Sequence, residues 1–551
     1  MIACASVSIA ASDAVEARSD ASAAGAARRV AALCVALFAF LLWVSPRSSL
    51  WDRDETLYAR AALDMTNGGG ALVPSAGGVP WLEKPPLLVW MQAAALGAGF
   101  PLETAARLPS ALAFALSAWF VFRAASLLLP AAEASTAAVI FLASPLVLLN
   151  GAAATTDALL LAGTTASLWA LALIVRRGPS ARRAAGLAAA MAAGLLAKGP
   201  PGVVLPLLAA ATVLLALRPK ERPRFARAAL AAALAAVAVF SCWAIPANVA
   251  TNGLVVSELF GRHVLRRALE PNDGHGGFGA AGLLVYPAVI LAGFAPWTLF
   301  LPAGLRAFPR RRSPEAALVF GGILAPILVF TLAATKLPAY VLPSLAPLAM
   351  LAAAGVHADS PSPRAGLAFY LPGAVPWLAL FGAAAFLAPT PALRFAAAGL
   401  LVVAAASALA GIAMLFGGRP RAAARAAGAG VASIAIVLTA VLPLAEPLRP
   451  VPAIAAGVRR AGPGSVAVFG FDEPSLDVYV SPRRVERLPS PRAASAWAAG
   501  SAPGVLVTTT GLAKELGLDG HPGLRVVAAA TGWNVSTGRR VSLVALQRGG
   551  P

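Results

Sequence analysis

Long apolar segments alternate with short polar connectors along most of this chain, from about residue 30 to about residue 444. Most of these segments approach the roughly 20 residues that an α-helix needs to cross a bilayer. The pattern predicts about thirteen transmembrane helices and hence a polytopic α-helical membrane protein. The expected spans lie near residues 30–46, 106–129, 132–150, 157–175, 184–197, 201–217, 228–249, 281–304, 315–334, 338–355, 366–388, 395–416 and 427–444.

Arginine runs occupy alternate connectors between these spans. They fall at residues 28–29, 176–183, 218–227, 306–312 and 419–425. Basic residues concentrate on the cytoplasmic side of membrane proteins, so this parity predicts a cytoplasmic N-terminus in the cytoplasmic (inner) membrane. The remaining connectors, which include the long loop over residues 47–105, are then expected to face the periplasm or cell exterior.

Composition supports this fold class and narrows the function. Hydrophobic residues make up 59% of the chain, and the mean hydropathy is +0.76, which is too apolar for a soluble core. The net charge of +20 comes from 44 Lys and Arg against 24 Asp and Glu. The basic residues lie mostly in the connectors, so the positive net charge is explained by the membrane topology. No nucleic-acid partner is therefore expected. The three cysteines do not indicate a disulfide framework.

The pattern divides the chain into three parts. Residues 1–29 are expected to form a cytoplasmic tail, and residues 30–445 a transmembrane domain with interfacial helices in its loop over residues 47–105. Beyond residue 445, short strand-like runs are separated by Gly, Pro and Asp. With an odd number of spans, residues 446–551 are expected to form a small α/β domain on the exterior side.

The first exterior loop gathers acidic and basic residues beside the membrane. An amphipathic helix is expected over residues 55–65, and an apolar helix over residues 87–98 is too short to span. Charge beside a bilayer is costly, so paired acids here indicate a functional site more than lipid anchoring. The residues singled out on this ground are Asp54, Glu55, Glu83 and Lys84.

Further polar groups stand at the exterior ends of later spans. Asp157 follows two threonines, so two interpretations stay open, a helix N-cap and a functional carboxylate. Lys198 precedes Gly-Pro-Pro, where a lysine can bind a lipid phosphate or extend to the headgroups. Lys336 and Tyr340 place another cation and a phenol at the same boundary.

One histidine in an exterior loop is a candidate metal ligand. His263 lies beside three arginines, and Glu83 could join it on a divalent cation. The spacing contains no compact metal motif, so a solvated loop histidine is the alternative interpretation.

Six short motifs occur in order between about residues 50 and 350. They read Asp-Glu-Thr-Leu-Tyr-Ala at 54–59, Glu-Lys-Pro-Pro-Leu at 83–87, Thr-Asp-Ala at 156–158, Lys-Gly-Pro at 198–200, Arg-His at 262–263 and Lys-Leu-Pro-Ala-Tyr at 336–340. Together they resemble the GT-C class of membrane glycosyltransferases. The likeness is closest to the 4-amino-4-deoxy-L-arabinose transferase branch, which is related to protein O-mannosyltransferases.

The resemblance implies a GT-C fold and a glycosyltransferase. Such an enzyme takes a sugar from a polyprenyl-phosphate carrier and passes it to a lipid, glycan or protein on the exterior face, with aminoarabinose and lipid A as one candidate pair. It implies catalytic roles for Asp54, Glu55 and Asp157. It implies contacts to the carrier phosphate for Lys84, Lys198, Tyr58, Lys336 and Tyr340. Finally, it implies a divalent metal held by Glu83 and His263.

Two positions depart from the branch and leave the substrates open. Leu57 stands where the branch often has Arg, and Trp81-Leu82 stands where it has an aromatic residue followed by Phe. A transporter or lipid flippase is the alternative function, and it would require charges in both halves of the bilayer and internal repeats. A membrane scaffold whose C-terminal tail binds a partner is a third hypothesis.

Overall fold

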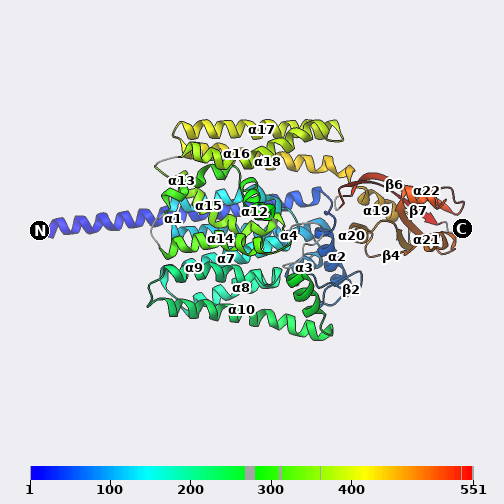
Figure 1. The fold of residues 1–551 in the computed structure, drawn as a ribbon, viewed down its shortest axis with the longest axis horizontal. Helices are drawn as coiled ribbons and strands as arrows, with labels where there is room; N and C mark the ends of the chain where they lie inside the picture. The colour runs from blue at the N-terminus through cyan, green and yellow to red at the C-terminus, as the bar shows by residue number, and fades with distance from the viewer. Residues whose placement is uncertain (1, 267–279, 309–312, 360–361, 535–536, 549–551) are drawn as a thin grey trace.

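The computed structural model describes residues 2–266, 280–308, 313–359, 362–534 and 537–548. Most of them form a bundle of apolar helices, with a small sheet domain beyond one end (Figure 1). The bundle helices are α1 Ile2–Val44, α4 Leu102–Leu128, α5 Ala131–Leu142, α6 Pro145–Gly151, α7 Thr156–Arg177, α8 Ala181–Lys198, α9 Pro201–Ala216, α10 Arg222–Ala250, α12 Ala280–Gly293, α13 Leu301–Ala307, α14 Pro314–Leu332, α15 Leu342–Val356, α16 Pro363–Leu387, α17 Pro391–Phe416 and α18 Pro420–Ala445.

The predicted fold class is confirmed, with fewer spans than expected. All thirteen apolar segments lie on helices, and within the described residues nine helices are long and apolar enough to cross a membrane. Two bent pairs, α5 with α6 and α12 with α13, raise the number to eleven if each is one span. Helix α9 has only 16 residues, and α8 carries three basic residues within 18. By length and apolarity, the candidate spans among the described residues thus number nine to eleven, against about thirteen expected.

The first long connector folds into short elements at one end of the bundle. It contains the 3₁₀ turn η1 Ser45–Arg47, helix α2 Asp54–Thr66, the hairpin β1 Ser75–Ala76 with β2 Val79–Pro80, and helix α3 Leu87–Gly97. Both helices lie where the apolar pattern predicts them. Proline lacks an amide hydrogen and fits the start of a helix, which explains why Pro86 immediately precedes α3.

The C-terminal part forms a five-stranded mixed sheet covered by helices. Its strand order is β4-β3-β5-β7-β6, with β3 parallel to β4 and β5, and β7 antiparallel to β5 and β6. The alternating side chains of β3 and β5 build separate cores on the two faces. The elements are α19 Pro450–Arg460, β3 Ser465–Phe469, α20 Pro474–Val480, β4 Val485–Arg487, α21 Pro491–Ala499, β5 Gly504–Thr509, α22 Thr510–Glu515, β6 Leu524–Asn534 and β7 Arg539–Arg548.

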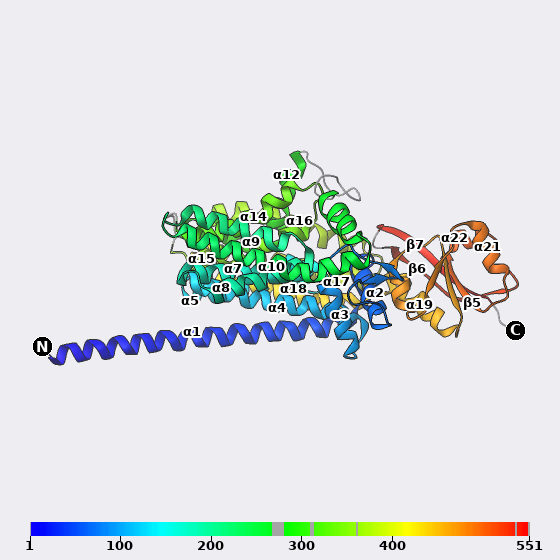
Figure 2. The ribbon, with the colours of Figure 1, turned by 90° about the horizontal axis from the view of Figure 1, so that it is seen from below.

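The first loop and the sheet domain share one end of the bundle. In Figure 1, α2, α3 and β2 lie next to α20 of the sheet domain, while the N-terminus lies at the far end. Helix α1 extends well beyond the bundle toward that far end (Figure 2). The N-terminus and the sheet domain lie at opposite ends of the bundle, as expected if the chain crosses the membrane an odd number of times between them. The alternation of arginine-rich connectors predicts the same topology.

Candidate functional site

An apolar cluster gathers the segments that carry the predicted site residues. Tyr58 and Ala61 of α2 pack with Leu88 of α3, Ala158 of α7 and Ala197 of α8, and all five are buried. Asp157 and Lys198 are the chain neighbours of two of these residues. Burial of the cluster therefore holds their polar side chains together at the same end of the bundle.

The strongest polar contact in this group joins Asp157 to Lys198. Lys198 Nζ donates to Asp157 Oδ1 in an ion pair, and the lysine side chain is only 9% exposed. The same ammonium lies 4.5 Å from the centre of the Tyr340 ring, which is within the range of a cation–π contact. Tyr340 in turn packs on Phe330 with ring centres 4.5 Å apart. Three of the residues implied by the family resemblance thus contact one another directly.

Tyr58 joins the first loop to this group. Its ring meets Trp81 edge to face at 5.3 Å, and its side chain is 7% exposed. Burial raises the pKa of the Tyr58 hydroxyl well above its usual range, and the nearby charges of Asp54, Asp157 and Glu83 act in the same direction. The phenol therefore stays protonated beside a set of carboxylates.

Asp54 and Lys84 are more accessible than this buried group. Asp54 is exposed at the first position of α2, where the helix dipole favours a negative charge. Lys84 is half-buried, and its ammonium donates to the carbonyl of Glu83 at 3.1 Å. The Asp54 side chain is thus open to solvent, and that of Lys84 is partly so.

Glu55 has a different environment from its neighbour Asp54. Its side chain is 2% exposed and accepts two hydrogen bonds from Arg107 of α4, at 2.9 and 2.7 Å. It also accepts from the amides of Trp51 at 2.8 Å and Ala154 at 2.7 Å. These four contacts occupy the carboxylate and favour a positioning role, so the predicted catalytic role of Glu55 stays a prediction that its environment does not support.

Arg107 is the residue that the sequence analysis missed. Besides Glu55, its guanidinium donates to the carbonyls of Ser45 at 2.6 Å, Ser48 at 2.9 Å and Ser49 at 3.0 Å. It thereby ties the end of α1 and the start of the first loop to α4. An arginine at the start of an apolar span, which carries a second arginine at Arg123, was the available signal, because a charge there requires a partner.

Lys336 makes contacts of another kind. Its side chain is buried, and its ammonium donates to the carbonyls of Phe330, Thr331 and Ala333 at the end of α14. Cations commonly bind the unpaired carbonyls of a helix C-terminus. The predicted phosphate contact of Lys336 stays a prediction, while its observed contacts are those of a helix cap.

The described residues do not form a metal site by themselves. No group of three or more His, Cys, Asp and Glu side chains that could hold a metal ion occurs among them. His263 belongs to the π-helical segment η2 Val255–Arg266, but its side chain lies outside the described residues. The predicted metal pair of Glu83 and His263 therefore stays a prediction, and no step below depends on it.

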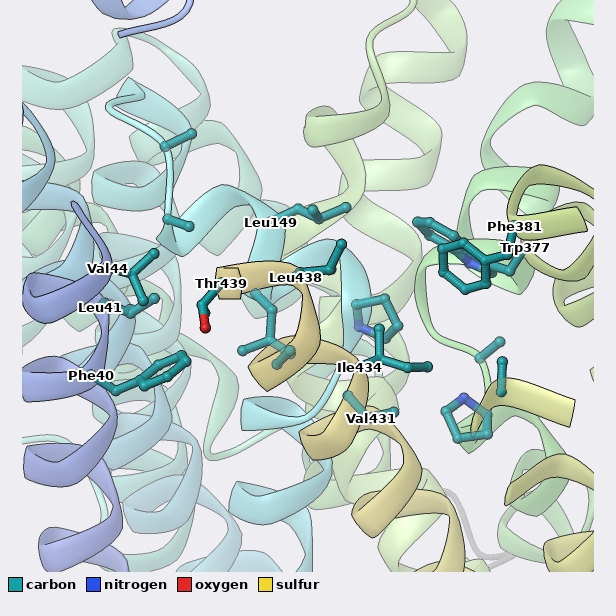
Figure 3. Close-up of a pocket in the computed structure, with 18 of the residues that line it drawn as sticks. Phe40, Leu41, Val44, Leu149, Trp377, Phe381, Val431, Ile434, Leu438 and Thr439 are labelled. Carbon is teal, nitrogen blue, oxygen red and sulfur yellow. The ribbon is translucent and has the colours of Figure 1, made fainter. Parts of the chain in front are cut away.

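A second feature is an apolar cavity of about 480 Å³ on the other side of the α6–α7 connector. Figure 3 shows its wall built by α1, α16 and α18. Ala152 and Ala153 of the connector line this cavity, whereas Asp157 a few residues later faces the Lys198 group. Its polar end is formed by Ser45, Ser48, Trp51 and Arg107. Arg107 lines the cavity and pairs with Glu55 of α2, so the cavity and the helix that carries Asp54 and Tyr58 adjoin at this ion pair.

Residues 83–245 match the dolichyl-phosphate-mannose-protein mannosyltransferase family. The structure is similar to that of ArnT from Cupriavidus metallidurans bound to undecaprenyl phosphate, with a TM-score of 0.74 over 93% of this chain and 97% of that one, at 21% identity. This likeness shows the fold.

Curated relatives extend the comparison. The undecaprenyl phosphate-alpha-4-amino-4-deoxy-L-arabinose arabinosyl transferase of Pectobacterium carotovorum is 31% identical over 339 residues, which cover 60% of this chain and 59% of that protein. The enzyme of the same name from Yersinia enterocolitica is 30% identical over 337 residues, covering 59% and 58%. The chain thus aligns with about three fifths of the length of these relatives. The resemblance predicted from the sequence motifs is confirmed.

Proposed function

We propose that this protein transfers a sugar from a polyprenyl-phosphate carrier to an acceptor at the exterior face of the cytoplasmic membrane. The observation that carries the proposal is the contact of Lys198 with both Asp157 and Tyr340, beside the cluster that also holds the segments of Asp54 and Lys84. These residues come from five separate segments and lie around one apolar cluster at one end of the bundle. Cations beside carboxylates at a membrane boundary suit a reaction in which a lipid phosphate leaves.

The chemistry follows from the charges of this group. An acceptor hydroxyl attacks the anomeric carbon of the sugar, a new glycosidic bond forms, and the bond to the carrier phosphate oxygen breaks. The departing polyprenyl phosphate gains negative charge, which the accessible ammonium of Lys84 stabilises. Asp54 accepts the proton of the acceptor hydroxyl, a role that suits an exposed carboxylate at a helix N-terminus, where the helix dipole favours its charged form.

The remaining residues hold this arrangement. The Asp157 carboxylate fixes the Lys198 ammonium against Tyr340, so that the lysine contributes a fixed positive charge near the carrier phosphate. Tyr58 stays protonated and can donate a hydrogen bond to a phosphate or sugar oxygen. Glu55 positions the first turn of α2 through Arg107.

We favour a lipid among the possible acceptors. The cavity of about 480 Å³ is lined mainly by apolar side chains and lies within the range of about 300–1,000 Å³ typical of ligand pockets. An acyl chain inside the cavity would leave its headgroup near Arg107 and Glu55, where the cavity adjoins α2. The names of the curated relatives support 4-amino-4-deoxy-L-arabinose on undecaprenyl phosphate as the donor to try first. Lipid A, which the motif resemblance implies, is the acceptor to try with it. Other sugars should be tested alongside aminoarabinose, because Leu57 stands where the aminoarabinose transferase branch often has Arg.

A transfer assay with purified protein tests this function. The full chain in lipid nanodiscs is given undecaprenyl-phosphate-linked sugars and lipid acceptors, and products are followed by mass spectrometry. Asp54→Asn should lower transfer at least 100-fold while carrier binding and folding stay unchanged. Full transfer by Asp54→Asn would remove that carboxylate from the mechanism. Movement of the carrier across the bilayer without any transfer would favour the flippase alternative.

A further inference from the structure

The sheet domain contacts the first loop through the short helix α20 and through Arg449, which donates to the Ser49 hydroxyl at 3.0 Å and stacks on Trp51. Of these two contacts, only α20 reaches helix α2. Figure 1 shows α20 beside α2, and the two helices are in direct contact. The side chain of Val478 leaves the sheet core and is 2% exposed in a separate cluster with Leu50, Ala59, Ala106 and Ala154. A residue of the C-terminal domain is therefore part of the packing around the loop that begins with Asp54.

Polar contacts surround this apolar one. The Tyr479 hydroxyl accepts from the amide of Leu50 at 2.7 Å and donates to Glu103 Oε1 at 3.1 Å. The amide of Ser475 donates to Asp52 Oδ1 at 3.1 Å. Each contact ends on the segment just before Asp54 or on the start of α4.

A third contact reaches α2 itself. Arg60 Nη1 donates to the carbonyl of Asp477 at 3.0 Å, while Arg60 Nε pairs with Asp64 one turn further along α2 at 2.9 Å. Ala59 and Arg60 thus face α20, whereas Tyr58 and Ala61 face the cluster beside Lys198. Helix α2 has 13 residues and is held between the sheet domain and the bundle.

Such a short helix is not stable alone in water, because isolated helices under about 12–15 residues are marginal. Its orientation therefore depends on what packs against both faces. We propose that α20 is a positioning element for the transfer reaction, in which Val478 and Tyr479 fix the orientation of α2 and hence of Asp54. This inference rests on the proposed function for its effect on catalysis, but the contact itself can be tested without activity.

Two valines on α20 make a matched pair for the test. Val478 packs against the first loop, whereas Val480 is 1% exposed in the core of the sheet domain. Val478→Ala and Tyr479→Phe should lower kcat about 3- to 10-fold, which corresponds to the loss of one modest contact. The KM for the polyprenyl-phosphate donor should change less than kcat does, because Lys84 and Lys198 are held by other elements and only Tyr58 of the donor contacts lies on α2. Val480→Ala should leave kcat unchanged and lower the stability of the sheet domain.

Hydrogen exchange on the full chain gives the second readout. Amides of α2 should exchange faster in Val478→Ala and Tyr479→Phe, and at the wild-type rate in Val480→Ala. Equal exchange of α2 in Val478→Ala and in the wild type would overturn the inference, as would equal losses of kcat in Val478→Ala and Val480→Ala. If the wild type transfers no sugar at all, the proposed function fails, and hydrogen exchange alone decides whether α20 holds α2.

Discussion

Replacing Arg107 by methionine should loosen the first loop more than any change at Asp54. The substitution leaves the Glu55 carboxylate, 2% exposed, with two backbone amide donors and no cation. Removing one partner of a buried ion pair costs about 3–5 kcal/mol. The three carbonyls at Ser45, Ser48 and Ser49 lose their donor at the same time. We therefore expect α2 to open at least 100-fold more often.

Hydrogen exchange of the α2 amides measures this opening directly. Asp54→Asn is the matched control, because it changes the neighbouring, exposed carboxylate and should alter exchange by only about 2- to 5-fold, the size of a helix-dipole effect. The double variant Arg107→Met with Glu55→Leu removes both charges. It should recover much of the protection, since an apolar pair can replace a buried ion pair.

The opposite pattern would refute the positioning role. If Arg107→Met exchanges like the wild type in α2 but abolishes transfer, then the pair acts in the chemistry. A catalytic role for Glu55 would then be restored, in line with the interpretation of the motif from sequence alone.

Three further outcomes are expected. Lys84→Ala should lower kcat/KM for the polyprenyl-phosphate donor about 10- to 100-fold by loss of a charge-assisted contact, and a change under 2-fold in steady-state assays would contradict the phosphate role. Ala435→Phe should fill part of the apolar cavity and raise the KM for the acceptor at least 10-fold. Ala432→Phe changes an exposed residue of the same helix and should leave that KM unchanged. Equal acceptor KM values in the two variants would exclude the cavity as the acceptor site. Burial and the charge of Glu473 raise the pKa of Asp52, which also faces Arg449. The thermal stability of the wild type, measured relative to Asp52→Asn, should therefore fall as the pH rises from the ordinary carboxyl range through the raised pKa. A stability difference that stays constant with pH would contradict this.

The helical architecture could be predicted because lipid imposes a simple rule on sequence. A segment that crosses the bilayer must be apolar and helical, and all thirteen segments found in this way are helices. The number of spans could not be predicted as well. The breaks before Pro145 and near Pro296 divide two segments into bent pairs, and apolarity alone does not report the angle.

The site could be predicted in part, as residues but not as contacts. Asp157 and Lys198 are 41 positions apart, and nothing in either local pattern indicates that they pair. Asp54 and Glu55 are adjacent in the motif, yet the helix points one outward and the other toward Arg107, a difference that depends on tertiary packing. The contacts of Val478 and Tyr479 could not be predicted, because the C-terminal segment carries no recognised motif.

Mass spectrometry of envelope lipids in a strain that lacks this protein tests the central claim most directly. We expect a sugar-modified lipid to disappear, to return with the wild-type chain, and to stay absent with Asp54→Asn expressed at the same level. The same experiment would name the sugar and the acceptor together. An unchanged set of envelope lipids and glycans in the deletion strain would contradict the transferase account.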